Sequence, residues 1–227
     1  MSEPTLLSDF NGRARLFPLP NLVFFPHVMQ PLHIFEPRYR QMTSDALADD
    51  RLIALVLPRP GWEKEYADRP AIHSVACIGR IMAQQQLDDG RYNILLRGIT
   101  RIRIVEEKPT SKLYRIGRCR VLQERPITDE ALAQQWRETL IEKSPSWFAA
   151  QSEVMEQMGK LLKSDLGLGT LCDIIAFALS LSADVKQNLL EELDVETRLT
   201  QLCEVLEAVK VVNESATRRF PPEFSVN

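Results

Sequence analysis

The residues that could support nucleotide chemistry do not have the spacing that this chemistry requires. A phosphate-binding loop needs two glycines separated by four residues, followed by Lys and then Ser or Thr. The chain contains one Gly-Lys pair, Gly159-Lys160, but Leu161 follows it and Val154 stands where the first glycine is needed. The pair also falls inside a helical apolar pattern. We therefore exclude nucleotide binding through this motif.

Residues that could act as nucleophiles or metal ligands are equally scattered. No Gly-x-Ser-x-Gly elbow is present, and no local feature indicates a Ser–Lys dyad. His27, His33 and His73 lie outside any His-Glu-x-x-His pattern, so we expect solvated or hydrogen-bonded imidazoles. We expect buried free thiols at the four cysteines, which form no Cys-x-x-Cys pair: Cys77, Cys119, Cys172 and Cys203. The sequence therefore predicts no catalytic residues, no metal and no cofactor.

Positive charge is concentrated in one stretch of predicted strands. Its cations are Arg91, Arg97, Arg101, Arg103, Lys108, Lys112, Arg115, Arg118 and Arg120. One basic sheet face could hold a phosphate backbone, but Tyr92 and Tyr114 are the stretch's only aromatic residues for stacking bases. The alternatives are an acidic protein partner or an ordinary solvated face. We take Arg101 and Arg103 as the candidate contacts and nucleic-acid binding as the second hypothesis.

The apolar pattern divides the chain into two halves. Residues 13–125 contain short runs rich in Ile, Val, Phe and Tyr between prolines and glycines, which indicates strands. Residues 126–217 have an apolar period of three to four, which indicates helices. We expect a β-rich domain over the first range and a helical subdomain over the second. The remaining residues, 1–12 and 218–227, are expected to form flexible tails.

In the first half, alternation and turn residues define the expected elements. We expect strands at 15–17, 31–35, 52–57, 75–87, 91–105 and 114–122. Pro37 can start a helix over 37–47, and Asp88-Asp89-Gly90 predicts a tight hairpin turn. Ile102 and Ile104 should face one side of their strand, with Arg101 and Arg103 on the other. Long hairpin strands of this kind favour a partly closed antiparallel barrel. The candidate core residues are Phe17, Val23, Phe25 and Phe35.

The second half predicts a bundle of about four or five helices. Apolar stripes mark three of them: Val154, Met155, Met158, Leu161 and Leu162; Leu171, Ile174, Ile175, Ala178 and Leu179; Leu199, Leu202, Leu206 and Val209. Ser182 and Asp194 are expected to cap the helices that follow them. Thr170 with Asp173 resembles a capping box.

A long loop in the first half, residues 58–70, holds two aromatic residues, Trp62 and Tyr66. Aromatic side chains exposed on a loop are typical anchors for partner proteins. The alternative is that Trp62 packs back onto the barrel.

The ends and the hydropathy exclude membrane insertion. The first twelve residues have no basic cluster and no apolar core, unlike a secretory signal. No apolar run approaches the roughly 18 residues that span a bilayer. The net charge of −3 gives no general attraction to nucleic acid or acidic lipid. We expect a cytoplasmic protein.

Three sequence motifs together resemble the amino-terminal substrate-recognition domain of the Lon proteases. They are Leu-Phe-Pro-Leu-Pro-Asn-Leu-Val-Phe-Phe-Pro at 16–26, Pro-Leu-His-Ile-Phe-Glu-Pro-Arg-Tyr at 31–39, and Leu-Arg-Gly-Ile-Thr-Arg at 96–101. A weaker match lies at 186–191 and 195–199. Order and spacing agree from about Arg15 to Glu207, which is nearly the whole chain.

The resemblance implies an α+β fold, with a PUA-like antiparallel β-barrel followed by an α-helical bundle subdomain. It also implies binding of other proteins or of unfolded, extended polypeptide segments. The binding surface is expected in a groove between barrel and helices, or on the loop with Trp62 and Tyr66. The ATPase and Ser–Lys protease modules of Lon are absent, so we expect a non-enzymatic adaptor or regulator of proteolysis. Cereblon shares a Lon-like region, but its zinc domain needs Cys-x-x-Cys pairs that this chain lacks.

The motif residues are expected to be mainly structural. They are Pro18, Asn21, Phe25, Pro26, Phe35, Glu36, Pro37, Arg38, Tyr39 and Gly98. Glu36 is unusual as an acid between Phe35 and Pro37. We expect it to cap the following helix or to pair with Arg38 or Arg101.

Overall fold

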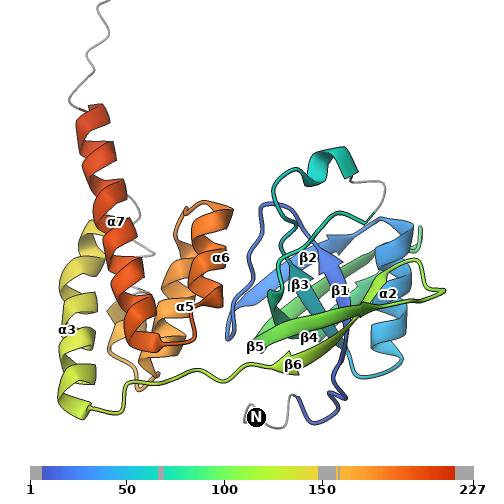
Figure 1. Cartoon of the computed structure of the whole chain (residues 1–227), viewed down its shortest axis with the longest axis horizontal. Coiled ribbons are helices and arrows are strands. Elements are labelled where there is room, and N and C mark those ends of the chain that lie inside the picture. The colour runs from blue at the N-terminus through green and yellow to red at the C-terminus, as the bar shows by residue number, and fades with distance from the viewer. Residues whose placement is uncertain (1–6, 66–68, 148–156, 158, 218–227) are drawn as a thin grey trace, which may run out of the picture. The chain divides into compact units, whose positions relative to one another are not determined.

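The computed structural model describes residues 7–65, 69–147, 157 and 159–217, and it divides into two compact units (Figure 1). The strand unit comprises Met1–Arg125 and Asp173–Leu193, and the helical unit comprises Pro126–Cys172 and Asp194–Asn227. The expected joint after Arg125 coincides with a unit boundary. Residues 173–193 differ from the expected division, because they belong to the strand unit.

Six strands form the sheet of the strand unit: β1 (Arg13–Pro18), β2 (Met29–Ile34), β3 (Leu52–Val56), β4 (Val75–Gln86), β5 (Tyr92–Lys108) and β6 (Arg115–Val121). Their order is β2-β5-β4-β3-β1-β6, and an additional β5–β6 pairing closes a ring of five strands. The predicted barrel is therefore confirmed. One pairing differs from the antiparallel expectation, since β1 runs parallel to β3.

The length of β5 explains why β2 lies outside this ring. The first part of β5, from Tyr92 to Arg97, pairs with β2, whereas Ile102 to Lys108 pairs with β6. β4 follows β5 along both parts. β2 thus extends the sheet as an edge strand, with β5 as its one strand partner among the described residues.

The barrel interior holds the apolar residues that alternation predicted. All five residues of β3 are buried, in agreement with its central position. Ile102 lies in the core cluster and Ile104 packs against it, which confirms their shared face. Phe17, Val23 and Phe25 are buried as expected.

Phe35 is the exception among the predicted core residues, because its side chain is 59% exposed. It directly follows the edge strand β2, whose alternate residues face outward. The prediction failed because the sequence does not show that β2 is an edge strand.

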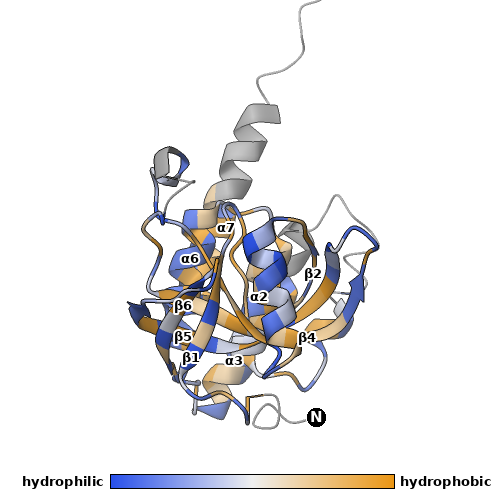
Figure 2. Cartoon of the chain, turned by 90° about the vertical axis from the view of Figure 1, so that its right-hand side faces the viewer, coloured by the Kyte–Doolittle hydropathy of each residue, from blue (hydrophilic) through white to orange (hydrophobic). Residues whose placement is uncertain are grey.

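Helix α2 (Pro37–Leu47) begins and ends where the sequence predicts. It buries Tyr39 and Met42 against the sheet and turns a hydrophilic face outward (Figure 2). Glu36 occupies the N-cap position without a side-chain cap bond. Its carboxylate instead binds Arg38 at 2.9 Å, which confirms one of the expected pairings.

The connections of the strand unit include the predicted hairpin. Gly90 has a φ of +78°, and the Leu87 amide donates to the Arg91 carbonyl at 2.8 Å. A short 3-10 helix, η1 (Trp62–Glu65), lies in the long connection between β3 and β4.

Besides α2, the strand unit includes α5 (Leu168–Ala178) from residue 173 onward and α6 (Ala183–Glu191). Ser182 caps α6 as predicted, since its hydroxyl accepts from the Val185 amide at 3.4 Å. The capping box expected at Thr170 and Asp173 is wrong, because α5 begins at Leu168. Asp173 is buried within the strand unit and binds Arg101.

The helical unit contains α3 (Glu130–Trp147) and α7 (Val195–Thr217). Asp194 caps α7 as predicted, because its carboxylate accepts from the Thr197 amide at 3.0 Å. Leu199, Leu202 and Leu206 form the expected buried stripe. Of the stripe expected around residue 160, Leu162 is buried, whereas Val154, Met155 and Met158 lie outside the described residues. None of the described helices is long and apolar enough to cross a membrane.

Candidate binding surfaces of the strand unit

Arg101 lies in the interior of the strand unit and not on a basic surface. Its side chain is 1% exposed. Two of its nitrogens donate to the two carboxylate oxygens of Asp173 at 2.6 and 2.8 Å, and a third donates to the Leu190 carbonyl at 2.9 Å. Glu124 accepts a further bond. The expected surface contact by Arg101 is therefore wrong, because α5 and α6 provide partners that cover it.

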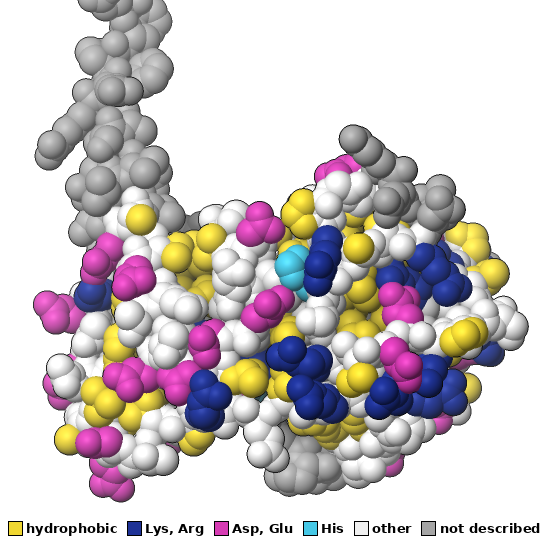
Figure 3. Space-filling model, in the orientation of Figure 1, with side chains coloured by type: hydrophobic (Ala, Val, Ile, Leu, Met, Phe, Trp, Pro, Cys, Tyr) yellow, Lys and Arg dark blue, Asp and Glu magenta, His cyan; other side chains and the backbone are white. Residues whose placement is uncertain are grey.

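The other cations of the basic stretch are largely paired as well. Ion pairs involve Arg91 with Asp89, Lys108 and Arg118 with Glu106, Lys112 with Asp45, and Arg115 with Glu107. Arg103 is half-buried. On the face drawn in Figure 3, Lys and Arg side chains gather over the strands, but Asp and Glu side chains lie among them. These pairs weaken the case for a continuous phosphate-binding face.

The structure describes one of the two loop aromatics that were predicted to bind a partner. Trp62 is half-buried within η1. Tyr66 lies outside the described residues. Their role in partner binding stays a prediction.

An exposed apolar row runs along β2. Its odd-numbered residues face outward, and Met29 and Phe35 are 43% and 59% exposed. Pro31 and His33 are exposed between them. The His33 and Phe35 rings stack with their centroids 6.2 Å apart and an interplanar angle of 26°. This row is unusual because large apolar side chains on an edge strand are normally avoided.

The row continues across the neighbouring strands. Pro31 lies opposite Leu95 of β5, which lies opposite Ala83 of β4. Directly opposite residues share one face of a sheet. Polar residues flank this strip, and His33 binds the Asn93 amide oxygen at 2.7 Å. We name the outward residues of this strip the β2 face: Met29, Pro31, His33, Phe35, Leu95 and Ala83.

The backbone edge of β2 is partly protected. The Gly98 amide donates to the Val28 carbonyl at 2.9 Å, so alternate carbonyls after Val28 point to β5 and those of Met29, Pro31 and His33 point away. Pro31 has no amide proton, and the Gln30 side chain donates to the Pro31 carbonyl at 2.8 Å. Proline on an edge strand discourages the addition of another strand. The side chains of the β2 face, more than its backbone, are therefore available to a partner.

A cavity of about 470 Å³ lies elsewhere on the strand unit. We name it the arginine cavity, and its lining consists of Leu16, Pro18, Arg38, Tyr39, Arg69, Leu113, Tyr114 and Arg115. The lining comes from β1, the start of α2, the connection before β4 and the β5–β6 connection. Pro18, Arg38 and Tyr39 were expected to be mainly structural, and the structure places them on the wall of this cavity.

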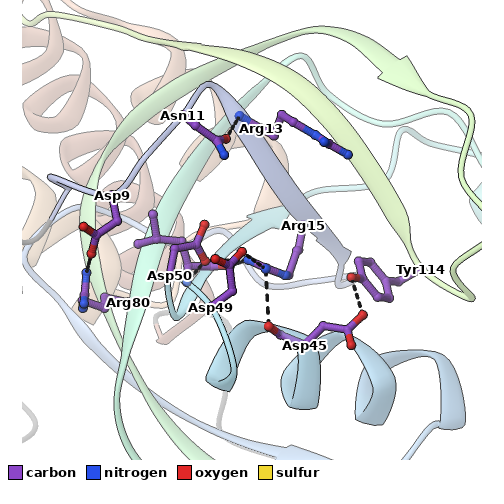
Figure 4. Close-up of polar contacts among 10 residues, drawn as sticks. Asp9, Asn11, Arg13, Arg15, Asp45, Asp49, Asp50, Arg80 and Tyr114 are labelled. Atoms are coloured by element: carbon purple, nitrogen blue, oxygen red, sulfur yellow. Dashed lines mark hydrogen bonds and ion pairs between the residues drawn. The ribbon is translucent and has the colours of Figure 1, made fainter.

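A polar pocket of about 330 Å³ shares Tyr114 with the arginine cavity (Figure 4). Arg15 binds Asp49 at 2.6 Å and Asp50 at 2.5 Å. The Tyr114 hydroxyl donates to Asp45 at 2.8 Å. These carboxylates already have cationic or hydroxyl partners, and no group of three or more potential metal ligands occurs among the described residues.

The remaining motif residues fix the backbone. Asn21 has a φ of +62°, a conformation that Asn tolerates better than most residues. A Cβ atom on Gly98 would lie 2.0 Å from the Phe25 carbonyl oxygen. The Gly98 carbonyl also accepts from the His27 amide at 2.9 Å. The first and third sequence motifs therefore meet at a close backbone contact, which supports their structural interpretation.

All four cysteines are buried with free thiols, as expected. Burial raises the pKa of Cys119 to about 11 and also raises that of Cys203. His73 lies 3.1 Å from Glu191, which matches the expected hydrogen-bonded imidazole.

Comparison with known proteins places these features in a family context. Residues 13–208 match the family model described as the ATP-dependent protease La (LON) substrate-binding domain. The chain is 26% identical to the Lon protease of Anaeromyxobacter dehalogenans over 215 residues, which are 91% of this chain and 24% of that protein. It is 29% identical to the Lon protease of Geobacter metallireducens over 196 residues, 84% of this chain and 23% of that protein. The chain thus spans about a quarter of the length of these relatives.

Solved structures show the same fold. A Lon N-terminal domain protein from Xanthomonas campestris aligns with a TM-score of 0.61 at 23% identity, covering 85% of this chain and 97% of that one. The N-terminal domain of the Mycobacterium avium complex Lon protease aligns with a TM-score of 0.63 at 19% identity, covering 86% and 98%. The expected α+β fold is confirmed.

Proposed function

Because the chain belongs to the Lon substrate-binding domain family, we propose that it is a cytoplasmic, non-catalytic module that recognises exposed apolar segments of other proteins on its β2 face. The family match covers the substrate-binding part of Lon and none of its catalytic parts. One observation of the structure supports this surface above others, the exposure of Phe35 and Met29 in one outward row. Contiguous apolar patches of this kind mark protein interaction sites.

The geometry of the β2 face suits an extended polypeptide. Its apolar side chains lie along the strand direction, and the opposite residues Leu95 and Ala83 widen the strip across the sheet. A bound segment could place alternate apolar side chains on this strip, because side chains of an extended chain alternate with a period of two. His33 and Asn93 offer polar contacts beside it.

Binding of a permanently unfolded protein tests this proposal. The probe is reduced, carboxymethylated α-lactalbumin carrying a fluorescent label, with native α-lactalbumin for comparison. We expect the unfolded form to bind, and we expect Phe35→Ser and Met29→Ser together to weaken binding about fivefold to thirtyfold. Loss of two partly exposed apolar anchors is worth roughly 1 to 2 kcal/mol at an interface.

Two exposed apolar residues outside the β2 face serve as matched controls. Val105 of β5 is 47% exposed and Leu166 of the helical unit is 37% exposed. Val105→Ser and Leu166→Ser should leave binding unchanged. Equal effects of all four substitutions, or no preference for the unfolded form, would exclude the β2 face as the binding surface.

We further propose that such binding regulates proteolysis, either by delivering segments to a Lon-type protease or by withholding them from it. Adding the chain to a Lon-type protease with casein as substrate should change the degradation rate. The Phe35→Ser, Met29→Ser double variant should lose this effect. A rate that responds equally to wild type and variant would contradict the regulatory role.

A further inference from the structure

The arginine cavity combines an apolar lining with cationic side chains, and none of the described residues in its wall is acidic. Leu16, Tyr39 and Tyr114 are buried behind this wall, at 0%, 5% and 3% exposed, whereas Pro18 is half-buried and partly accessible. Leu113 is 62% exposed at the same site. The volume of about 470 Å³ is sufficient for one large side chain with the adjoining backbone group.

Three arginines give this wall its charge. The Arg115 side chain is 10% exposed and is held by Glu107 and by the Pro70 carbonyl at 2.8 Å. Arg38 binds Glu36 and lies over the Tyr39 ring, with its guanidinium carbon 4.6 Å from the ring centroid. Neither of the partner carboxylates lines the cavity. Glu107 and Glu36 therefore orient the Arg115 and Arg38 guanidinium groups from positions outside the lining of the cavity.

Arg69 is available to a ligand. It is exposed, and it forms no ion pair within the part of the chain that the structure describes. Its planar guanidinium offers paired N–H donors that match a carboxylate.

The start of α2 contributes to the same site. Arg38 and Tyr39 belong to its first turn, which contains no acidic residue and no side-chain cap bond. The N-terminal end of a helix carries a partial positive charge that favours an anion. Glu36 already stands at the N-cap and binds Arg38, and Glu107 binds Arg115, so Arg69 is the cation that a ligand anion would meet beside the apolar wall.

We propose that the arginine cavity binds the carboxy-terminal residue of a polypeptide, with its apolar side chain against Pro18 and Leu113 and its α-carboxylate against Arg69. Successive side chains of an extended chain point in opposite directions. An internal Asp or Glu and its apolar neighbour would therefore face opposite ways. A chain terminus carries both groups on one Cα atom. The inference rests on the proposed function, because its ligand is part of a protein partner.

Fluorescence anisotropy with the full chain tests the inference. The probe is a fluorescein-labelled hexapeptide that ends in Ala-Leu-Phe with a free carboxylate, compared with its carboxy-terminal amide. We expect the amide to bind roughly tenfold more weakly, which is the effect of losing a charge-assisted hydrogen bond. Arg69→Ala should weaken binding of the free-acid peptide to a similar degree and leave binding of the amide peptide unchanged.

Two further variants make the result specific. Leu113→Asp places a carboxylate in the lining and should repel the free acid more than the amide. Arg120→Ala removes an exposed arginine of β6 that lies outside the lining, so it should change neither affinity. Equal binding of acid and amide, or equal effects of Arg69→Ala and Arg120→Ala, would overturn the inference.

The outcome is independent of the β2 face. If unfolded α-lactalbumin binds in a Phe35-dependent manner but no hexapeptide binds, the arginine cavity inference fails and the proposed function stands. If the free-acid peptide binds but unfolded protein does not, the proposed use of the β2 face fails instead.

Discussion

Arg101 on β5 and Asp173 on α5 bind each other through two hydrogen bonds, although they lie 72 residues apart in the chain. Both side chains are 1% exposed. The Leu190 carbonyl, near the carboxy-terminal end of α6, accepts a third hydrogen bond from Arg101. A buried charge with this many partners fixes the strands relative to residues 173–193, which explains why that segment belongs to the strand unit.

Removing one member of this pair should destabilise the strand unit strongly. Asp173→Ala leaves the Arg101 charge buried with fewer partners, which typically costs about 3 to 5 kcal/mol of unfolding free energy. Urea denaturation followed by circular dichroism measures the loss. Replacing both residues in an Arg101→Met, Asp173→Leu variant should recover part of it, because no buried charge remains.

The control for this prediction is an exposed ion pair. Asp89 and Arg91 lie 2.6 Å apart, with side chains 49% and 45% exposed. Asp89→Ala should leave the urea midpoint unchanged. If Asp173→Ala and Asp89→Ala behaved alike, the buried pair would have no special role in stability.

Gly98 should tolerate no side chain. Its added Cβ would lie 2.0 Å from the Phe25 carbonyl oxygen and 3.2 Å from the Pro26 Cα, and both are backbone atoms that cannot rotate away. We expect Gly98→Ala to lower the unfolding free energy by about 3 kcal/mol, as overpacking does. Thermal denaturation measures the change.

Gly159 provides the opposite case. It lies in a helical segment, and among the described residues no atom outside its own helix lies within 4 Å of its added Cβ. Gly159→Ala should therefore raise the unfolding free energy by about 0.5 to 1 kcal/mol, because alanine favours helix. A stable Gly98→Ala variant would contradict the close contact between the first and third motifs.

The cysteines should resist modification in the folded chain. Burial raises the pKa values of Cys77, Cys119 and Cys203, so the reactive thiolate is scarce at neutral pH. Iodoacetamide at pH 7.5 should label none of these three residues rapidly. In 6 M guanidinium all four cysteines should be labelled, as mass spectrometry can show. Rapid labelling of Cys119 in the native chain would mean that β6 opens readily.

Most of the barrel could be predicted because its signals are local. The Pro37 helix, the hairpin at Gly90 and the caps at Ser182 and Asp194 depend on neighbouring residues alone. Alternation likewise placed Ile102 in the core. Such features can be predicted from sequence because they depend on contacts between residues only a few positions apart.

The candidate surfaces could not be predicted because they depend on strand order. Phe35 is exposed only because β2 pairs with one strand, and Arg101 is buried only because α5 and α6 reach its face. The arginine cavity joins Leu16 of β1 with Arg69 and Leu113 from two separate connections. The apolar run around Phe35 would have the same sequence in a central or an edge strand. Tertiary structure alone therefore decides whether Phe35 is buried or exposed.

The Tyr114 hydroxyl and the Asp45 carboxylate form a pair that should respond to pH at both extremes. Burial raises the pKa of Tyr114 to about 12, with the hydrogen bond to Asp45 as the next cause. Desolvation opposes ionisation of Asp45, but hydrogen bonds from Lys112 and Tyr114 outweigh it and lower its pKa. Tyrosine in an unfolded chain titrates near 10 and aspartate near 3.9. The Tyr114 contribution to stability is therefore complete below about pH 10 and disappears as pH rises through 12.

Ultraviolet titration of tyrosinate should reveal this pair directly. One of the chain's four tyrosines should ionise near pH 12, and the Tyr114→Phe variant should lack that step. Asp45→Asn removes the neighbouring charge, so the Tyr114 midpoint should fall toward 10 while burial keeps it above that value. The Asp45 contribution has the opposite sign, since its lowered pKa makes it complete above about pH 4 and lost as pH falls further. A Tyr114 midpoint near 10 in the wild type, unchanged in Asp45→Asn, would show that the hydroxyl is solvated and that the wall shared by the two pockets is open.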